Sequence, residues 1–241
     1  MEQERGVPRA QKKNYQKQLD AVIGQLQHAR TQEQDAAPTP RKKPSLLLHA
    51  CCAPCSSYVI EYLAEHFAIT ILYYNPNIYP PEEYARRLVE LERFLPRFAP
   101  AVEGGVRLVS APYNPQEFYD AVGTAESPER AADPEKGERC RRCYEFRLRR
   151  AYQYAAENGF QWFTTTLSIS PFKDAEKIND IGAALTTIAP GAPRFLPSDF
   201  KKNGGFQRSL ALSREYGLYR QQYCGCVYSK EGAERGRSAE S

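Results

Sequence analysis

The sequence has no long apolar run. None of its stretches approaches the roughly 18 consecutive apolar residues of a transmembrane helix. No apolar segment follows the charged residues near Met1, so neither a membrane partner nor a secretory signal is expected. A Gly-rich phosphate loop is also missing, which argues against an ATP-dependent enzyme. Because a protein that is not exported rarely relies on disulfides, the sequence predicts a cytoplasmic protein whose cysteines bind metal or carry out redox chemistry.

The composition is that of an ordinary globular protein. Hydrophobic residues make up 41% and charged residues 26% of the 241 positions, and a chain of this length can bury a sizeable core. We predict three parts: a polar extension with a short helix and a linker at 1–43, a catalytic α/β domain with a C-terminal redox segment at 44–230, and a polar tail at 231–241. The net charge of +4 is too small to indicate a nucleic-acid partner by itself.

Short apolar runs alternate with amphipathic segments through the main part of the chain, a pattern typical of parallel βαβ units. The predicted strands are Ser45–Ala50, Ala68–Tyr74, Val106–Ser110, Phe160–Thr165 and Arg194–Pro197. The predicted helices are Tyr15–Leu26, Ser56 to about His66, Glu82–Phe94, Cys140 to about Gly159, Pro171–Thr187 and Phe206–Tyr219. We therefore expect a Rossmann-like parallel sheet with flanking helices, in a single domain with a helical C-terminal part.

The seven cysteines fall into three tight groups. These are Cys51-Cys52-Ala53-Pro54-Cys55, Cys140-Arg141-Arg142-Cys143 and Cys224-Gly225-Cys226. Thiolates that bind a soft metal or exchange disulfides must lie within a few ångströms of one another. The grouping therefore predicts a sulfur-ligated metal centre beside a separate dithiol.

The first two groups are candidates for the metal centre. Cys51 and Cys52 follow the first predicted strand, at the edge where open α/β sheets bind ligands. Cys140 and Cys143 have chelate spacing at a helix start, which would stabilise both thiolates. Four such sulfurs suit Zn²⁺ or an iron–sulfur cluster. Neighbouring cysteines point apart in a regular strand, which favours the larger cluster, but a purely structural zinc site remains an alternative. Cys55 would bind a second metal or simply begin the next helix.

The third group is a candidate redox pair. The glycine between Cys224 and Cys226 permits unusual backbone angles, so the two sulfurs can form a strained, readily reduced disulfide. A pair of metal ligands is the alternative. Four tyrosines surround this segment and could pack, stack on a flipped nucleobase or lend a proton; they are Tyr216, Tyr219, Tyr223 and Tyr228.

Five segments together resemble the QueH-type epoxyqueuosine reductases of the queuosine tRNA pathway. They are LLLHACCAPCSSYVIEYL, YYNPNIYPPEEYARR, GERCRRCYEFRLRRA, TTTLSISPFKD and LPSDFKKNGGFQRSLALSREYGLYRQQYCGC. The resemblance spans about residues 13–229. A single CxxC would be weak evidence, whereas an ordered set across nearly the whole chain is specific.

The resemblance implies that epoxyqueuosine in a tRNA anticodon loop is reduced to queuosine, with two electrons and two protons removing the epoxide oxygen as water. It implies a sheet of the adenine-nucleotide α-hydrolase type. The partners would be tRNA carrying epoxyqueuosine and an electron donor that the sequence does not identify. By position, the resemblance makes Cys224 and Cys226 the redox-active pair, and the ligands of a [4Fe–4S] cluster would be Cys51, Cys52, Cys140 and Cys143.

Such a reduction needs an acid near the epoxide oxygen. Asp199 or one of the C-terminal tyrosines is a candidate, although Asp199 could equally cap a turn or helix. His49 could support the first cysteines or be an ordinary buried imidazole. The acidic, Ala-rich segment Gly123–Asp133 is expected to be peripheral. Basic side chains that could hold anticodon phosphates are Arg139, Arg141, Arg142, Lys201, Lys202 and Arg208.

Three other functions compete with the reductase. A zinc-stabilised tRNA-binding module would have no catalytic activity. A cluster-dependent tRNA thiolation enzyme would need an ATP-pyrophosphatase loop of the SGGxDS kind where CCAPCSS stands. A thiol–disulfide oxidoreductase would use Cys224 and Cys226 and leave five cysteines without a role.

Overall fold

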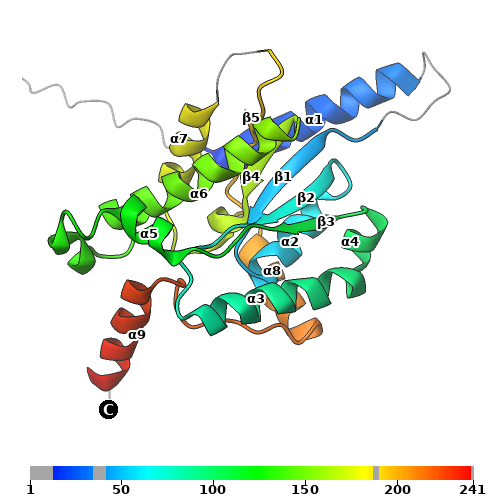
Figure 1. Ribbon diagram of the computed structural model, residues 1–241. Helices are drawn as coiled ribbons and strands as arrows, with labels where there is room; N and C mark the ends of the chain where they lie inside the picture. The colour runs from blue at the N-terminus through cyan, green and yellow to red at the C-terminus, as the bar shows by residue number, and fades with distance from the viewer. Residues whose placement is uncertain (1–12, 35–41, 187–189, 240–241) are drawn as a thin grey trace, which may run out of the picture.

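A five-stranded parallel sheet forms the centre of the protein (Figure 1). The computed structural model describes residues 13–34, 42–186 and 190–239. The strand order is β3-β2-β1-β4-β5, and every neighbouring pair is parallel. The strands are β1 (Ser45–Ala50), β2 (Ala68–Tyr73), β3 (Arg107–Ser110), β4 (Trp162–Thr165) and β5 (Arg194–Phe195). This confirms the predicted α/β fold class.

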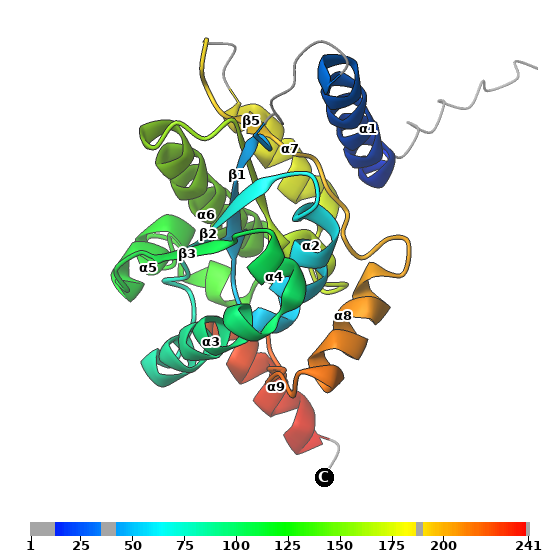
Figure 2. The ribbon, with the colours of Figure 1, turned by 90° about the vertical axis from the view of Figure 1, so that its right-hand side faces the viewer.

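The central strand β1 is buried on both faces, which explains its run of apolar residues. In β1, Leu46 and Leu48 belong to one hydrophobic cluster, and Leu47 between them belongs to the other. The first cluster includes residues of α2, α3 and α8, and the second includes residues of α6 and α7. Two layers of helices therefore cover the sheet, as Figures 1 and 2 show.

The order of the strands places a switch point beside β1. The chain adds β2 and β3 on one side of β1, then crosses over through α6 to add β4 on the other side. Ligand sites in such sheets lie at the carboxyl ends of the strands at this point. The helices are α1 (Tyr15–Gln34), α2 (Ala53–Leu63), α3 (Pro81–Phe94), α4 (Ala99–Glu103), α5 (Pro115–Val122), α6 (Glu138–Glu157), α7 (Ala175–Leu185), α8 (Gly205–Glu215) and α9 (Val227–Ala239). The 3₁₀ helices are η1 (Leu95–Arg97), η2 (Pro128–Ala132) and η3 (Thr166–Ile169).

Two helix starts differ from the predicted ones because of local capping. Helix α2 begins at Ala53 rather than at Ser56, since Pro54 occupies its first turn, where a missing N–H costs nothing. Helix α7 begins at Ala175 rather than at Pro171. The side chain of Asp174 accepts hydrogen bonds from the backbone N–H groups of Glu176 and Lys177, and it thereby fixes the start of the helix.

Helix α1 is longer than predicted and packs against the sheet domain. It extends to Gln34, so the first residues of the expected linker are helical, and residues 35–41 of that linker lie outside the described residues. Leu19 of α1 is fully buried in the first cluster. The Tyr15 hydroxyl donates to Asp180 of α7 at 3.2 Å, and Tyr62 of α2 donates to Asp20 at 2.6 Å. The helix thus contacts helices from both layers.

The C-terminal part of the chain ends in α9, where the sequence predicted only a polar tail from residue 231. Figures 1 and 2 show α9 at the end of the molecule opposite to α1. None of the helices in the described ranges has the length and hydropathy that crossing a bilayer requires.

Candidate active site

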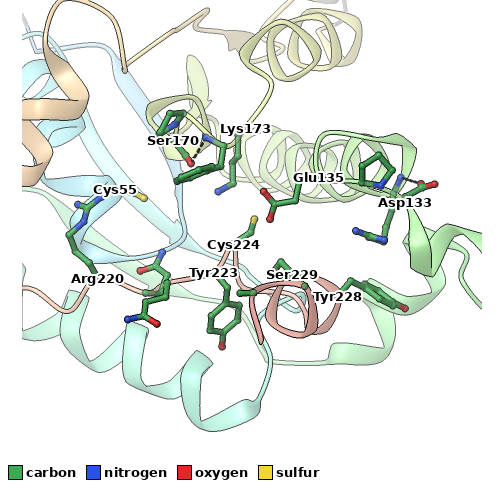
Figure 3. Close-up of a pocket in the computed structure, with 18 of the residues that line it drawn as sticks. Cys55, Asp133, Glu135, Ser170, Lys173, Arg220, Tyr223, Cys224, Tyr228 and Ser229 are labelled. Carbon is green, nitrogen blue, oxygen red and sulfur yellow. Dashed lines mark hydrogen bonds between the residues drawn. The ribbon is translucent and has the colours of Figure 1, made fainter. Parts of the chain in front are cut away.

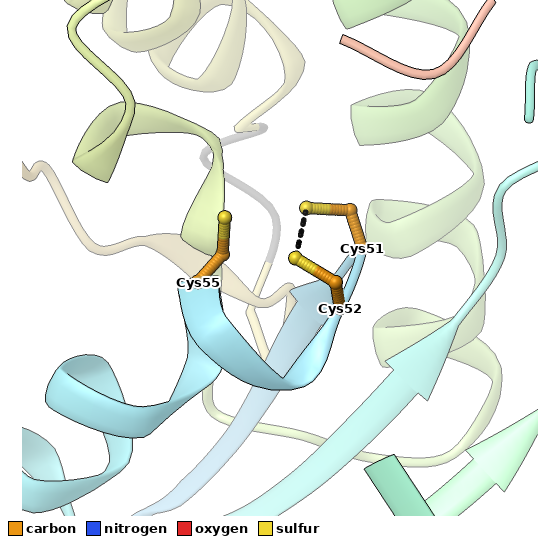
Figure 4. Close-up of side chains that lie close together, drawn as sticks. All are labelled: Cys51, Cys52 and Cys55. Atoms are coloured by element: carbon orange, nitrogen blue, oxygen red, sulfur yellow. Dashed lines mark hydrogen bonds between the residues drawn. The ribbon is translucent and has the colours of Figure 1, made fainter. Parts of the chain in front are cut away.

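Cys51, Cys52 and Cys55 lie directly beyond the carboxyl end of β1, where α2 begins. The Sγ atoms of Cys51 and Cys52 are 3.7 Å apart, and all three sulfurs lie within 4.8 Å of one another (Figure 4). The expectation that Cys51 and Cys52 point apart is wrong, because the strand ends at Ala50 and Cys52 already caps the helix. Three sulfurs in this arrangement could hold a soft metal ion.

The three thiols differ in how readily they ionise. Contacts from the thiols of Cys52 and Cys55 lower the pKa of Cys51 well below its usual value, although burial opposes this, and the nearby cations Lys173 and Arg147 help. The same contact with Cys51 raises the pKa of Cys52 to about 12. Cys51 therefore loses its proton first, and the thiolate is the form that binds metal.

Cys140 and Cys143 lie in the first turns of α6, as predicted. The expected stabilisation of their thiolates by the helix N-terminus is outweighed by desolvation: burial raises the pKa of Cys143 to about 12 and also raises that of Cys140. A bound metal cation displaces such protons. These two thiols therefore stay protonated and unreactive unless a metal ion binds them.

Three buried cations in addition to Arg139 lie around the cysteine groups. They are Arg87 of α3, Arg147 of α6 and Lys173 of the loop before α7, with exposed fractions of 0%, 2% and 7%. Arg147 donates to Asn75 at 2.6 Å and to the His49 ring at 3.4 Å. Buried positive charge is costly unless negative charge lies nearby.

Arg87 is the clearest case of incomplete pairing. Its Nε donates to Glu83 at 2.7 Å, and its Nη2 lies 2.7 Å from the same oxygen as an ion pair without hydrogen-bond geometry. Its Nη1 is buried and has no hydrogen-bond partner among the described residues. The cysteine and cation set therefore fits a thiolate-ligated centre that carries net negative charge.

The Cys224-Gly225-Cys226 segment packs beside Arg87. Gly225 has a φ of +134°, and a Cβ atom at this position would lie 3.2 Å from Nη1 of Arg87, so glycine suits both the backbone angle and the close approach. The Gly225 carbonyl accepts from the N–H of Tyr79 at 2.8 Å, and its own N–H donates to Ser229 at 3.2 Å. All seven cysteines carry free thiols, so the redox-active disulfide stays a prediction.

A cavity of about 520 Å³ opens beside these groups (Figure 3). Cys55, Lys173 and Cys224 line it, and Tyr223, Phe172 and the start of α9 form part of its walls. Residues 131–135 form another wall. The segment Gly123–Asp133 is therefore not peripheral, because its last residues border the cavity.

Comparison with known proteins identifies the family. The profile of the family described as "Epoxyqueuosine reductase QueH" matches residues 46–232. The chain belongs to the QueH family. A protein named "Epoxyqueuosine reductase QueH" from Streptococcus pyogenes serotype M1 is 42% identical over 187 residues, which cover 78% of this chain and 71% of that protein.

Two staphylococcal proteins of the same name match over a longer range. The Staphylococcus epidermidis protein is 38% identical over 226 residues, covering 93% of this chain and 88% of the relative. The Staphylococcus aureus protein is 38% identical over 219 residues, covering 91% and 85%. All three cysteine groups lie within the residues that the family profile matches.

The predicted phosphate-binding residues are mostly engaged with the protein itself. Arg139 is buried and donates to the carbonyls of Arg130 and Ala131, both at 2.7 Å. Arg141 and Arg142 pair with Glu138. Lys201 pairs with Asp199 and Arg208 pairs with Glu61, whereas Lys202 is exposed. Apart from Arg139, none of the six is among the described residues that line the cavity, so their contacts with tRNA stay predictions.

The predicted acids already form ion pairs or hydrogen bonds with other residues. Asp199 is buried against Lys201 at 2.5 Å and does not line the cavity in the described part of the chain. Tyr223 donates its hydroxyl proton to the carbonyl of Tyr79 at 2.6 Å, and Tyr228 donates to Thr124 at 2.9 Å. His49 is a buried, hydrogen-bonded imidazole that contacts Thr165 at 2.8 Å.

Sequence reasoning missed the buried cations. Arg87, Arg147 and Lys173 come from three separate segments, and each resembles a surface residue when its own segment is considered alone. One signal was available for Lys173: it lies eight residues beyond Thr165, the last residue of a central strand, and directly before a helix-capping aspartate. That position places it at the edge of the sheet that carries the ligand site.

Proposed function

We propose that this protein reduces epoxyqueuosine in the anticodon loop of tRNA to queuosine. One observation carries the proposal: in a chain of the QueH family, thiols from the first and third cysteine groups border one cavity that also contains a buried ammonium group. The reaction takes up two electrons and two protons and releases the epoxide oxygen as water. Thiols can supply electrons, and a buried cation beside them can stabilise negative charge that develops during the reduction.

We propose that the metal centre is a [4Fe–4S] cluster. Its ligands would be Cys51, Cys52, Cys140 and Cys143, with the buried guanidinium groups of Arg87 and Arg147 offsetting its negative charge. Such a cluster supplies electrons one at a time when it is bound. Cys55 would hold a second metal ion, since its sulfur lies within 4.8 Å of those of Cys51 and Cys52.

The other residues of the site would bind the substrate and exclude water. Tyr223 and Tyr228 line the cavity with aromatic surface on which a flipped base can stack. Cys224 also lines the cavity, while Cys226 is not among its described lining residues. In the proposed redox pair, Cys224 is therefore the thiol that faces the substrate. Reduced thiols and a tRNA substrate agree with the predicted cytoplasmic location.

The test is to purify the protein without oxygen and to assay it with tRNA that contains epoxyqueuosine. We expect four iron and four sulfide per chain, and conversion to queuosine when a chemical reductant is present. Cys140→Ala should lose both iron and activity. Cys224→Ala should keep the iron but lose turnover. The control is Arg149→Ala, a substitution at an exposed position on α6, which should behave like the wild type.

Other outcomes would contradict the proposal. One zinc ion without sulfide, in a protein that binds tRNA and does not reduce it, would favour the zinc-stabilised binding module. Full activity of Cys224→Ala would remove the redox role of the third cysteine group.

A further inference from the structure

We propose that Lys173 is the catalytic acid that protonates the epoxide oxygen as it leaves. This assignment rests on the proposed reductase function and deepens it, because it names the proton donor. The residue is absent from the acids that the sequence suggested, and its place in the structure singles it out.

The backbone holds Lys173 in one position. It lies in the loop between η3 and α7, where its N–H donates to the carbonyl of Ser170 at 3.2 Å. The next residue, Asp174, is fixed as the cap of α7 by two hydrogen bonds. Only 7% of Lys173 is exposed, and Figure 3 shows its ammonium end directed into the cavity that Cys224 and Cys55 also line.

The ammonium group of Lys173 has no hydrogen bond or ion pair with any other described residue. Burying a charged group without a partner is costly, so a buried lysine that faces a cavity is a candidate for function. The sulfur-bearing side chains of Cys224 and Cys55 line the same cavity.

The other polar groups at the cavity are poorer proton donors. The hydroxyls of Tyr223 and Tyr228 already donate to Tyr79 and Thr124. Arg139 and Arg220 line the cavity, but a guanidinium group does not give up its proton in proteins. Glu135 also lines the cavity, and Figure 3 shows its side chain directed inward, but the residue is exposed and an ionised carboxylate only accepts protons. Lys173 is thus the one buried group among the described lining residues whose protons are both unengaged and transferable.

An ammonium group can transfer its proton to the leaving oxygen. An oxygen that leaves a carbon–oxygen bond is far more basic than an amine, so it takes a proton from the ammonium group as the bond breaks. The ammonium group of Lys173 carries three such protons, and no described residue engages them.

The proposed redox pair releases as many protons and electrons as the reduction of the epoxide consumes. Both carbon–oxygen bonds of the epoxide break, a carbon–carbon double bond forms, and the oxygen leaves as water after gaining two protons. Oxidation of the Cys224 and Cys226 thiols to a disulfide releases two electrons and two protons, which equals the demand. Lys173 transfers the first proton from Nζ to the oxygen and recovers one from the Cys224 thiol beside it.

The experiment compares Lys173→Ala, Lys173→Met and Lys173→Arg in the holoenzyme. The control is Lys177→Ala, a lysine four residues along whose Nζ donates to the carbonyl of Lys136. We expect all three Lys173 variants to reduce epoxyqueuosine about 10²- to 10⁴-fold more slowly. Their iron content and their Kd for tRNA should stay within twofold of the wild type. Methylammonium, which carries protons, should restore at least tenfold activity to Lys173→Ala, and tetramethylammonium should not.

Three results would overturn the assignment. If Lys173→Arg keeps the wild-type rate, or if tetramethylammonium restores activity as well as methylammonium does, only a charge is needed at this position. If the variants lose iron, Lys173 serves the metal centre instead. Failure of the wild type to reduce epoxyqueuosine would contradict the proposed function itself, and the two failures are therefore distinguishable.

Discussion

Buried positive charge distinguishes the site at the scale of single residues. Arg87 is an example: it lies on the inner face of α3, fully covered, beside Gly225 and close to Cys52. Helical spacing pairs it with Glu83, one turn earlier. The pair is buried, so removing either partner leaves an uncompensated charge.

Arg87→Met should therefore destabilise the fold by about 3–5 kcal/mol, because the carboxylate of Glu83 would remain buried without its partner. Urea denaturation followed by circular dichroism measures the effect. The double variant Glu83→Gln/Arg87→Met should recover part of the loss.

The control for this prediction is Arg93→Met, an exposed change on the same helix, which should alter the free energy of unfolding by less than about 0.5 kcal/mol. If Arg87→Met and Arg93→Met are equally stable, the buried pair does not contribute to stability.

At the scale of elements, α1 is an integral part of the fold rather than a loose extension. Leu19 is fully buried in the cluster that also contains Leu46 of β1. Its neighbours on α1 form hydrogen bonds to α2 and α7. The sequence shows the amphipathic spacing of this helix, but it does not show which surface receives the apolar face.

Leu19→Ala should destabilise the protein by about 2–5 kcal/mol, the usual cost of an emptied leucine site in a core. Lys17→Ala, at an exposed position two residues earlier, should change the free energy of unfolding by less than about 0.5 kcal/mol. Equal urea midpoints for Leu19→Ala and the wild type would show that α1 does not stabilise the sheet domain.

The sequence predicted those features that depend on only a few neighbouring residues. The strand at Ser45–Ala50 and the helix start at Cys140 were predictable, because apolar runs and chelate spacing lie within a few residues. Helix starts were harder to predict. The sequence predicted the helices near Cys55 and Asp174, but their first residues differ from the prediction by three or four positions, because a proline and a capping side chain determine where each helix begins.

The remaining features depend on contacts between distant segments. The sequence does not indicate that Lys173 faces Cys224, which is 51 positions later, or that residues 131–135 border the same cavity. Asp199 shows the converse case: its position suggested an acid, and its ion pair with Lys201, two residues away, became visible only in the structure, so its role as an acid stays a prediction. Partners of this kind become visible only when the topology is known.

At the scale of the whole molecule, the cavity mouth is the surface that would meet RNA. Phe172 lines the cavity, and 67% of its surface is exposed. An exposed aromatic ring beside the cavity suits stacking on a neighbouring nucleotide of the anticodon loop.

Phe172→Ala should weaken tRNA binding by about 5- to 100-fold, which corresponds to the loss of one stacked base. Phe172→Tyr should bind like the wild type. Fluorescence anisotropy with a labelled anticodon stem-loop measures the effect.

The matched control is Val102→Ala. Val102 is an apolar residue of α4 with 59% exposure, and it is not among the described residues that line the cavity. An equal loss of affinity in both variants would show that the effect is not local to the cavity mouth.

Helix α9 supplies one wall of the cavity and follows both the sheet and the first two cysteine groups along the chain. Because N-terminal parts of a nascent chain fold first, the sheet can form before that wall is in place. Until α9 packs, Cys55 and Lys173 face open solvent. A metal ion would therefore have its widest access to the sulfurs before this helix encloses them.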